Sequence, residues 1–140
     1  MPSAYYDINA QQHTTLNFHA EYYDDNGNAV DLTGYSARLH VRPSTDSSKL
    51  YLMVTTSGVT SGGSTGEFGA TTGISGSGGI FLNKGETGAV FTGGILITAD
   101  ATTMGYVRAG SWKYSLDITK GVTTEELMQG QFVVAPKTTR

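Results

Sequence analysis

The sequence predicts an all-β protein, built either as an antiparallel sandwich or as a small barrel. Apolar and polar side chains alternate with a period of two in several stretches, which is typical of strands with one buried face. Gly, Pro and Asn-Gly turn signals separate these stretches at short intervals, as in sandwiches and barrels. No internal repeat with a period of roughly 20 to 50 residues is present, so solenoids and propellers are not indicated.

The first third of the chain contains two clear strands. Residues 1–12 lack periodicity, and we expect a flexible arm, either a short edge strand or a segment docked on another subunit. Residues 14–23 alternate and lead into an Asn-Gly turn, which supplies the positive φ angles of a hairpin. Residues 35–42 form the second strand. Its apolar face carries Ala37, Leu39 and Val41, and its basic face carries Arg38, His40 and Arg42.

The middle of the chain is dominated by a glycine-rich stretch. Pro43 ends the preceding strand because it cannot donate a ladder hydrogen bond, and residues 49–56 form the next strand. Residues 57–79 consist almost wholly of Gly, Ser and Thr, and loops of this length are usually functional or mobile. We expect a flexible insertion that Phe68 and Ile74 pin to the domain or to a neighbour.

The C-terminal half completes the sheet. Asp100 is placed to accept backbone N–H groups at the start of a short helical turn. Residues 124–129 could pass for helix, but they lie between hairpin signals, so we interpret them as strand. Trp112 and Tyr114 alternate in phase with Leu116, which indicates core positions. Further strands are expected over residues 79–82, 89–91, 95–98, 110–118 and 124–134.

Length and charge restrict the classes of protein. The 140 residues suit one domain, and the lack of cysteine rules out disulfides and thiolate chemistry. The net charge of −3 argues against a nucleic-acid partner that is bound by phosphate neutralisation. We expect no signal peptide and no membrane span. A surface poor in charge and rich in Gly, Ser, Thr and Tyr favours a subunit of an assembly.

No pattern indicates catalysis or a cofactor. His13, His19 and His40 do not have metal-site spacing, and we interpret them as solvated strand residues. The Asp- and Asn-rich residues 24–31 lack the EF-hand pattern, so we assign them to turns. Neither a G-x-S-x-G elbow nor a phosphate-binding loop occurs, and the adjacent Glu125-Glu126 would point to opposite faces of a strand. We therefore expect neither an enzyme nor a metal or cofactor.

Two segments resemble a family of small structural proteins of tailed bacteriophages. Residues 26–42 read N-G-N-A-V-D-L-T-G-Y-S-A-R-L-H-V-R, which matches the family's turn, D-L-T-G-Y and strand ending in Arg. Residues 94–140 match its strand, short turn, aromatic strand and hairpin in order and spacing. The family is similar to the immunoglobulin-like N-terminal domain of siphophage upper-baseplate proteins. One departure is that residues 57–93 are longer and richer in glycine than the family's middle segment.

The resemblance implies an immunoglobulin-like sandwich and a virion subunit of the tail, baseplate or fibre-connecting region, assembled in the host cytoplasm. Its expected partners are other virion proteins and further copies of itself, with neither nucleic acid nor membrane. A capsid decoration or neck protein is the alternative in the same class, and a carbohydrate-binding module for host attachment is the alternative in another class. The candidate interface residues, inferred from the sequence itself, are Tyr5, Tyr6, Arg38, His40, Arg42, Phe68, Ile74 and Arg140.

Overall fold

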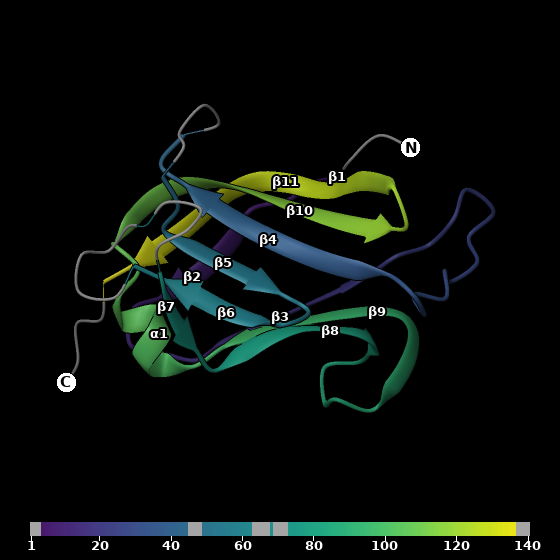
Figure 1. The fold of residues 1–140 in the computed structure, drawn as a ribbon, viewed down its shortest axis with the longest axis horizontal. Helices are drawn as coiled ribbons and strands as arrows, with labels where there is room; N and C mark the ends of the chain where they lie inside the picture. The colour runs from purple at the N-terminus through teal and green to yellow at the C-terminus, as the bar shows by residue number, and fades with distance from the viewer. Residues whose placement is uncertain (1–3, 45–48, 63–67, 69–72, 137–140) are drawn as a thin grey trace.

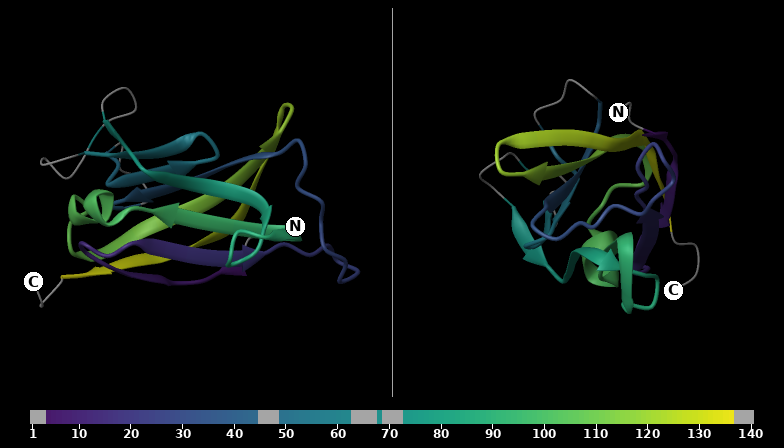
Figure 2. Two further views of the ribbon diagram at one scale, coloured as in Figure 1. Left: turned by 90° about the horizontal axis from the view of Figure 1, so that it is seen from below. Right: turned by 90° about the vertical axis from the view of Figure 1, so that its right-hand side faces the viewer.

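The chain folds into an all-β, immunoglobulin-like sandwich of two curved sheets with one short helix, as a computed structural model shows (Figure 1). The structure describes residues 4–44, 49–62, 68 and 73–136. Seen along the long axis in Figure 2, the strands surround a single central core. The fold class predicted from the sequence is confirmed.

The larger sheet has eight strands, and the C-terminal hairpin lies within it. Its strands in spatial order are β1 (Ala4–Tyr5), β11 (Thr123–Ala135), β10 (Gly110–Lys120), β4 (Ser36–Arg42), β5 (Leu52–Thr55), β6 (Gly58–Ser61) and β7 (Ile74–Gly76). The eighth strand, β2 (Ile8–Gln11), pairs with β11 further along. Both β1 and β2 run parallel to β11, whereas the other pairs of this sheet are antiparallel.

The smaller sheet has three antiparallel strands, and β9 (Val90–Ala99) lies between β3 (Leu16–Glu21) and β8 (Gly78–Lys84). The strands β5 and β6 extend the sheet of the C-terminal hairpin, as the two additional strands of variable-type immunoglobulin domains do. This arrangement places β3 at one edge of the smaller sheet.

The apolar face predicted for residues 35–42 lies in the core. Leu39 and Val41 have no exposed surface, and they pair across the strands with Leu116 and Tyr114 of β10. Ile97 of β9 is also fully buried and belongs to the same core. Because these side chains are tightly packed, Leu39→Ala should lower the free energy of unfolding by about 2–5 kcal/mol.

The D-L-T-G-Y segment is a turn in which each residue has a separate physical role. The carboxylate of Asp31 accepts hydrogen bonds from the backbone N–H of Thr33 at 3.0 Å and from its hydroxyl at 2.7 Å. Leu32 is buried in the core, and its carbonyl accepts from the N–H of Tyr35 at 3.1 Å. Gly34 lies between them with φ +85°, a value that a tight turn of this type requires and that glycine adopts without strain.

Asn83 fastens this turn to the smaller sheet. Its side-chain oxygen accepts from the N–H groups of Leu32 and Gly93, each at 3.1 Å, and its amide nitrogen donates to Asp31 at 2.9 Å. Asn83 itself has φ +58° and lies where the register between β8 and β9 shifts. Asn tolerates this left-handed conformation better than most residues do. One side chain therefore connects three segments that are distant in sequence.

The glycine-rich residues 57–79 are not one long loop. They contribute β6, β7 and the start of β8, because main-chain pairing does not need large side chains. Phe68 is buried and exchanges two backbone hydrogen bonds with Leu50, at 2.8 and 2.9 Å. Phe68 thus pins the insertion to its own domain, one of the two alternatives expected. Residues 63–67 and 69–72 lie outside the described part of the chain.

Several other local predictions are confirmed, although Trp112, which was expected in the core, is only partly buried and packs against it. Asp100 caps α1 (Ala101–Gly105) by accepting from the N–H of Thr103 at 3.0 Å. Residues 124–129 are strand, as part of β11. The strands expected at 89–91 and 95–98 are one continuous strand, β9. Of the two alternatives for the N-terminal residues 1–12, the described part forms edge strands on the chain's own sheet.

Candidate functional site

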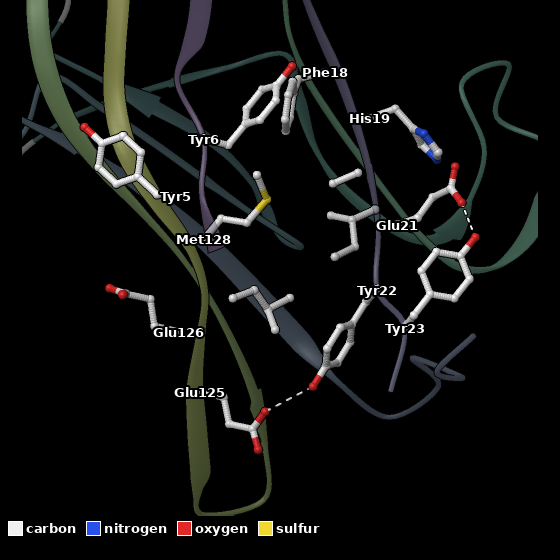
Figure 3. Close-up of a pocket in the computed structure, with 13 residues that line it drawn as sticks. Tyr5, Tyr6, Phe18, His19, Glu21, Tyr22, Tyr23, Glu125, Glu126 and Met128 are labelled. Carbon is white, nitrogen blue, oxygen red and sulfur yellow. Dashed lines mark hydrogen bonds between the residues drawn. The ribbon is translucent and has the colours of Figure 1, made fainter. Parts of the chain in front are cut away.

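A groove of about 510 Å³ lies between β3 and the beginning of β11, at the end of the sandwich near β1 (Figure 3). Its walls come from opposite sheets, and the N-terminal segment borders it. Aromatic, aliphatic and acidic side chains contribute to it, and none of the described residues that line it is lysine or arginine. The lining residues are Tyr5, Tyr6, Phe18, His19, Ala20, Glu21, Tyr22, Tyr23, Ile95, Glu125, Glu126, Leu127 and Met128.

The groove exists because the N-terminal strands pair with β11 instead of with β3. Tyr5 pairs with Gln129, and Ile8 pairs with Phe132, so β1 and β2 extend the larger sheet. Among the strands that the structure describes, β3 pairs with β9 alone. Within the described part of the chain, residues 123–126 of β11 likewise pair with β10 alone. Two sheet edges therefore face the same opening.

The free edge of β3 carries backbone hydrogen-bonding groups. The N–H of Tyr22 donates to Gly93 at 2.8 Å, and its carbonyl accepts from Val30 at 3.1 Å, so both groups of Tyr22 point away from the groove. Backbone direction alternates along a strand, and β3 pairs with β9 without a register shift. The N–H and C=O groups of His19 and Glu21 consequently point toward the open side. Such an edge can accept a further strand.

The floor of the groove is apolar and continuous with the core. Ile95 at its bottom is 1% exposed. Phe18, Ala20 and Tyr22 alternate on the inward face of β3, yet each is only partly buried, and they pack against the core from this side. The core is therefore incompletely covered along β3. Burying this apolar surface would favour binding of a partner, since removal of such surface from water is worth about 25 cal/mol per Å².

Tyrosines surround the opening. Tyr5, Tyr6 and Tyr23 are 67%, 53% and 45% exposed. The ring of Tyr6 lies 5.7 Å from that of Phe18, measured between centroids, and closes the upper end of the groove in Figure 3. Exposed tyrosines gathered at one opening are typical of binding surfaces, because their rigid rings provide contact area at a small cost in entropy.

Three carboxylates give the groove a negative charge. The hydroxyl of Tyr22 donates to Glu125 across the opening at 3.4 Å, and the hydroxyl of Tyr23 donates to Glu21 on the same strand (Figure 3). Partial burial and the charge of Glu125 raise the pKa of Tyr22, and the hydrogen bond to Glu21 raises the pKa of Tyr23. Both hydroxyls therefore stay protonated at neutral pH. Glu126 points to the opposite face of β11 from Glu125 but also borders the groove, with a third carboxylate.

A β-bulge determines which glutamate faces the groove. The pairing of β10 with β11 passes from Leu116–Met128 to Asp117–Glu126, so that Leu127 is an extra residue on β11. The bulge exchanges the two faces of the strand for all residues before it. As a result Glu125, paired with the buried Ile118, lies on the inward side and reaches Tyr22. The expectation that neighbouring glutamates point to opposite faces agrees with this register.

The basic face predicted on β4 lies on the outside of the larger sheet, away from the core. Arg38 forms an ion pair with Asp117 at 3.6 Å. The Nδ1 atom of His40 lies 3.0 Å from a guanidinium nitrogen of Arg42, and both residues line a second pocket of about 200 Å³. Burial lowers the pKa of His40, and the charges of Arg42 and Arg38 lower it further. His40 is thus half-buried and neutral instead of solvated.

Phe68 and Ile74, which were also predicted as interface residues, do not line the groove. Phe68 is buried, Ile74 is exposed on β7, and Arg140 lies outside the described residues. Tyr5 and Tyr6 are the two predicted residues that line the groove. The sequence did not indicate Phe18, because a residue on the apolar face of an alternating strand ordinarily lies in the core. It did not indicate Glu125, because the bulge at Leu127 that turns Glu125 inward has no local sequence signal.

The part of the chain that the structure describes has neither a cluster of metal ligands nor a helix of membrane-spanning length. No three His, Asp or Glu side chains there are grouped so that they could hold a metal ion. The described helix, α1, has five residues, and none in this part is long and apolar enough to cross a membrane. The ring of His19 packs edge-on against Phe91 at 5.9 Å, so this histidine is not solvated either.

Comparison with known proteins gives no assignment, because neither a scan of protein-family models nor a search of curated proteins finds a match to this chain.

Proposed function

We propose that this protein is a structural subunit of a tailed-bacteriophage virion, in the tail, baseplate or fibre-connecting region, and that it acts by assembly with other virion proteins. The resemblance of residues 26–42 and 94–140 to small phage structural proteins supports the class of protein. The immunoglobulin-like sandwich is the fold that this resemblance implies. The function is therefore binding and positioning of neighbours.

The groove beside β3 is the observation that carries the proposal. It combines a free strand edge, an apolar floor and exposed tyrosines, which together are the features of a protein-docking surface. The walls of the surface belong to two paired sheets, and a long hydrogen bond of 3.4 Å between Tyr22 and Glu125 spans them, which favours a preformed shape. A partner would not have to induce its shape, and preorganisation lowers the entropy cost of association.

Purified particles provide the test. Phage particles made from a genome that encodes this chain should contain it in amounts comparable to those of known structural proteins, as quantified by mass spectrometry. A density map of the particle should then contain the sandwich in the tail or baseplate. Absence of the chain from particles, despite its expression in infected cells, would overturn the proposal. Density in the head or neck would favour the decoration protein.

A carbohydrate-binding module is the second candidate, and the exposed tyrosines favour it. Tyr5 and Tyr6 border a groove that also contains three glutamates, and aromatic rings with carboxylates are groups that can stack on sugars and bind their hydroxyls. A glycan array separates the two functions. Glycan binding that is lost in both Tyr5→Ala and Tyr6→Ala would support this candidate, and an array without hits would reject it.

A further inference from the structure

We propose that the groove binds an extended segment of a neighbouring protein, which adds as a strand to the free edge of β3 and carries lysine or arginine among alternating apolar residues. This inference rests on the proposed function and specifies the chemistry of the partner. The mode is β-strand addition, in which main-chain hydrogen bonds supply affinity and side-chain pockets supply specificity.

The backbone of β3 provides the first argument. His19 and Glu21 direct their N–H and C=O groups toward the opening, as the alternation from Tyr22 requires. An added strand would satisfy these groups in the same way that β9 satisfies the other edge of β3. The N-terminal strands β1 and β2 pair with β11 instead. No described strand of this chain occupies the place beside β3, so a strand of another chain can add there.

The floor provides the second argument. Side chains of a strand alternate between its two faces, so every second residue of the incoming segment would point toward the core. That side meets Ile95, Leu127 and Met128, and the inward face of β3 borders it. Apolar residues at these alternate positions would complete the partly covered core. The opposite residues would face solvent and need not be apolar.

Charge identifies the rest of the partner's chemistry. Glu21, Glu125 and Glu126 line the groove, and no lysine or arginine among the residues that the structure describes lines it with them. A lysine or arginine of the incoming segment would find carboxylates and tyrosine rings at the opening, and cations interact favourably with both. An acidic segment would be repelled. The preferred occupant is therefore basic and apolar in alternation.

A displayed library of random peptides, each roughly ten residues long to match a long strand, tests the proposal on the full chain. We expect selection against the wild-type protein to enrich peptides with alternating apolar residues and at least one lysine or arginine. The most discriminating variant is His19→Pro. It removes the N–H of residue 19, which points toward the groove, and it leaves the hydrogen bonds between β3 and β9 in place, as proline on an edge strand allows. His19→Ala is its matched control, because it removes the same ring and keeps the N–H.

Binding of the enriched peptides should be at least about fivefold weaker in His19→Pro than in His19→Ala, the effect of losing one hydrogen bond and its geometry. Far-ultraviolet circular dichroism checks that both variants fold. Ala20→Phe serves as a second variant, since it fills the groove and leaves the backbone unchanged, and it should also abolish binding. Replacing the three glutamates by Gln should weaken basic peptides selectively.

Several outcomes would overturn strand addition. The first is a selection that enriches no peptide, and the second is enrichment of peptides that lack basic residues. The third is that His19→Pro and His19→Ala bind the peptides equally well and that Ala20→Phe does not weaken binding. Incorporation of both His19→Pro and Ala20→Phe into particles at the wild-type level would reject strand addition and leave the virion assignment intact. Absence of the wild-type chain from particles would reject the virion assignment instead. Glycan binding that depends on Tyr5 and Tyr6 would assign the groove to sugars.

Discussion

Replacing Asn83 by Ala is expected to destabilise the protein strongly, because this partly buried residue of β8 holds the D-L-T-G-Y turn by its side chain. The substitution removes the acceptor for the N–H groups of Leu32 and Gly93, which are both partly buried. It also removes the donor to Asp31 and leaves alanine at φ +58°. The D-L-T-G-Y turn would lose its connection to the smaller sheet.

The magnitude follows from these contacts. Each partly buried N–H that loses its acceptor costs about 1 kcal/mol, so the two together cost about 2 kcal/mol. Alanine in the left-handed region adds about 1 kcal/mol. We therefore expect Asn83→Ala to lower the free energy of unfolding by about 3 kcal/mol, a large share of the roughly 5–15 kcal/mol of a typical domain.

Urea unfolding, followed by tryptophan fluorescence, measures this loss as a shift of the midpoint at constant slope. Asn83→Gly separates the two contributions, since glycine adopts a positive φ without strain and should lose only the hydrogen bonds, about 2 kcal/mol. Asn26→Ala is the matched control on the exposed hairpin turn. Asn26 takes part there through its backbone N–H, which alanine keeps, so a change within about 0.5 kcal/mol is expected.

A loss below about 1 kcal/mol in Asn83→Ala would refute the reasoning, because two orphaned N–H groups cost more than that. Equal losses in the alanine and glycine variants would refute the conformational contribution alone. An effect of Asn26→Ala as large as that of Asn83→Ala would show that any change in a turn is harmful.

Three further predictions concern pH, the N-terminal strand and the helix. Burial in the folded protein holds the pKa of His40 below its usual 6.5, so the unfolded chain binds a proton at His40 more readily than the folded one. The free energy of unfolding should therefore fall as the pH drops below about 6.5. His40→Gln should flatten this dependence in thermal melts between pH 5 and 8. A Cβ at Gly130 would lie 2.3 Å from the carbonyl oxygen of Tyr6, so Gly130→Ala should displace β1 and speed hydrogen exchange at the Tyr6 amide. Asp100→Ala should cost about 1 kcal/mol of stability through loss of the cap of α1, and a smaller loss than about 0.3 kcal/mol would contradict the capping role.

The sequence alone determined the strands that have strong local patterns. The alternation of Leu39 and Val41 with basic residues predicted β4 and its buried face, because a period of two has one structural explanation. The N-cap role of Asp100 and the turn at Gly34 were also local, since each depends on hydrogen bonds or φ angles within a few residues. The tyrosines at the groove, Tyr5 and Tyr6, could be named for their residue type and position.

The tertiary structure decided the features that make the groove. Only the fold shows that Tyr5 pairs with Gln129 of β11, and that β3 keeps a free edge. Only the register shift at Leu127 brings Glu125 to Tyr22. The physical reason is that strand partner and register depend on contacts between residues more than a hundred positions apart. Local β-propensity differs little between the possible strand partners and registers, so the packing of the whole core determines which of them forms.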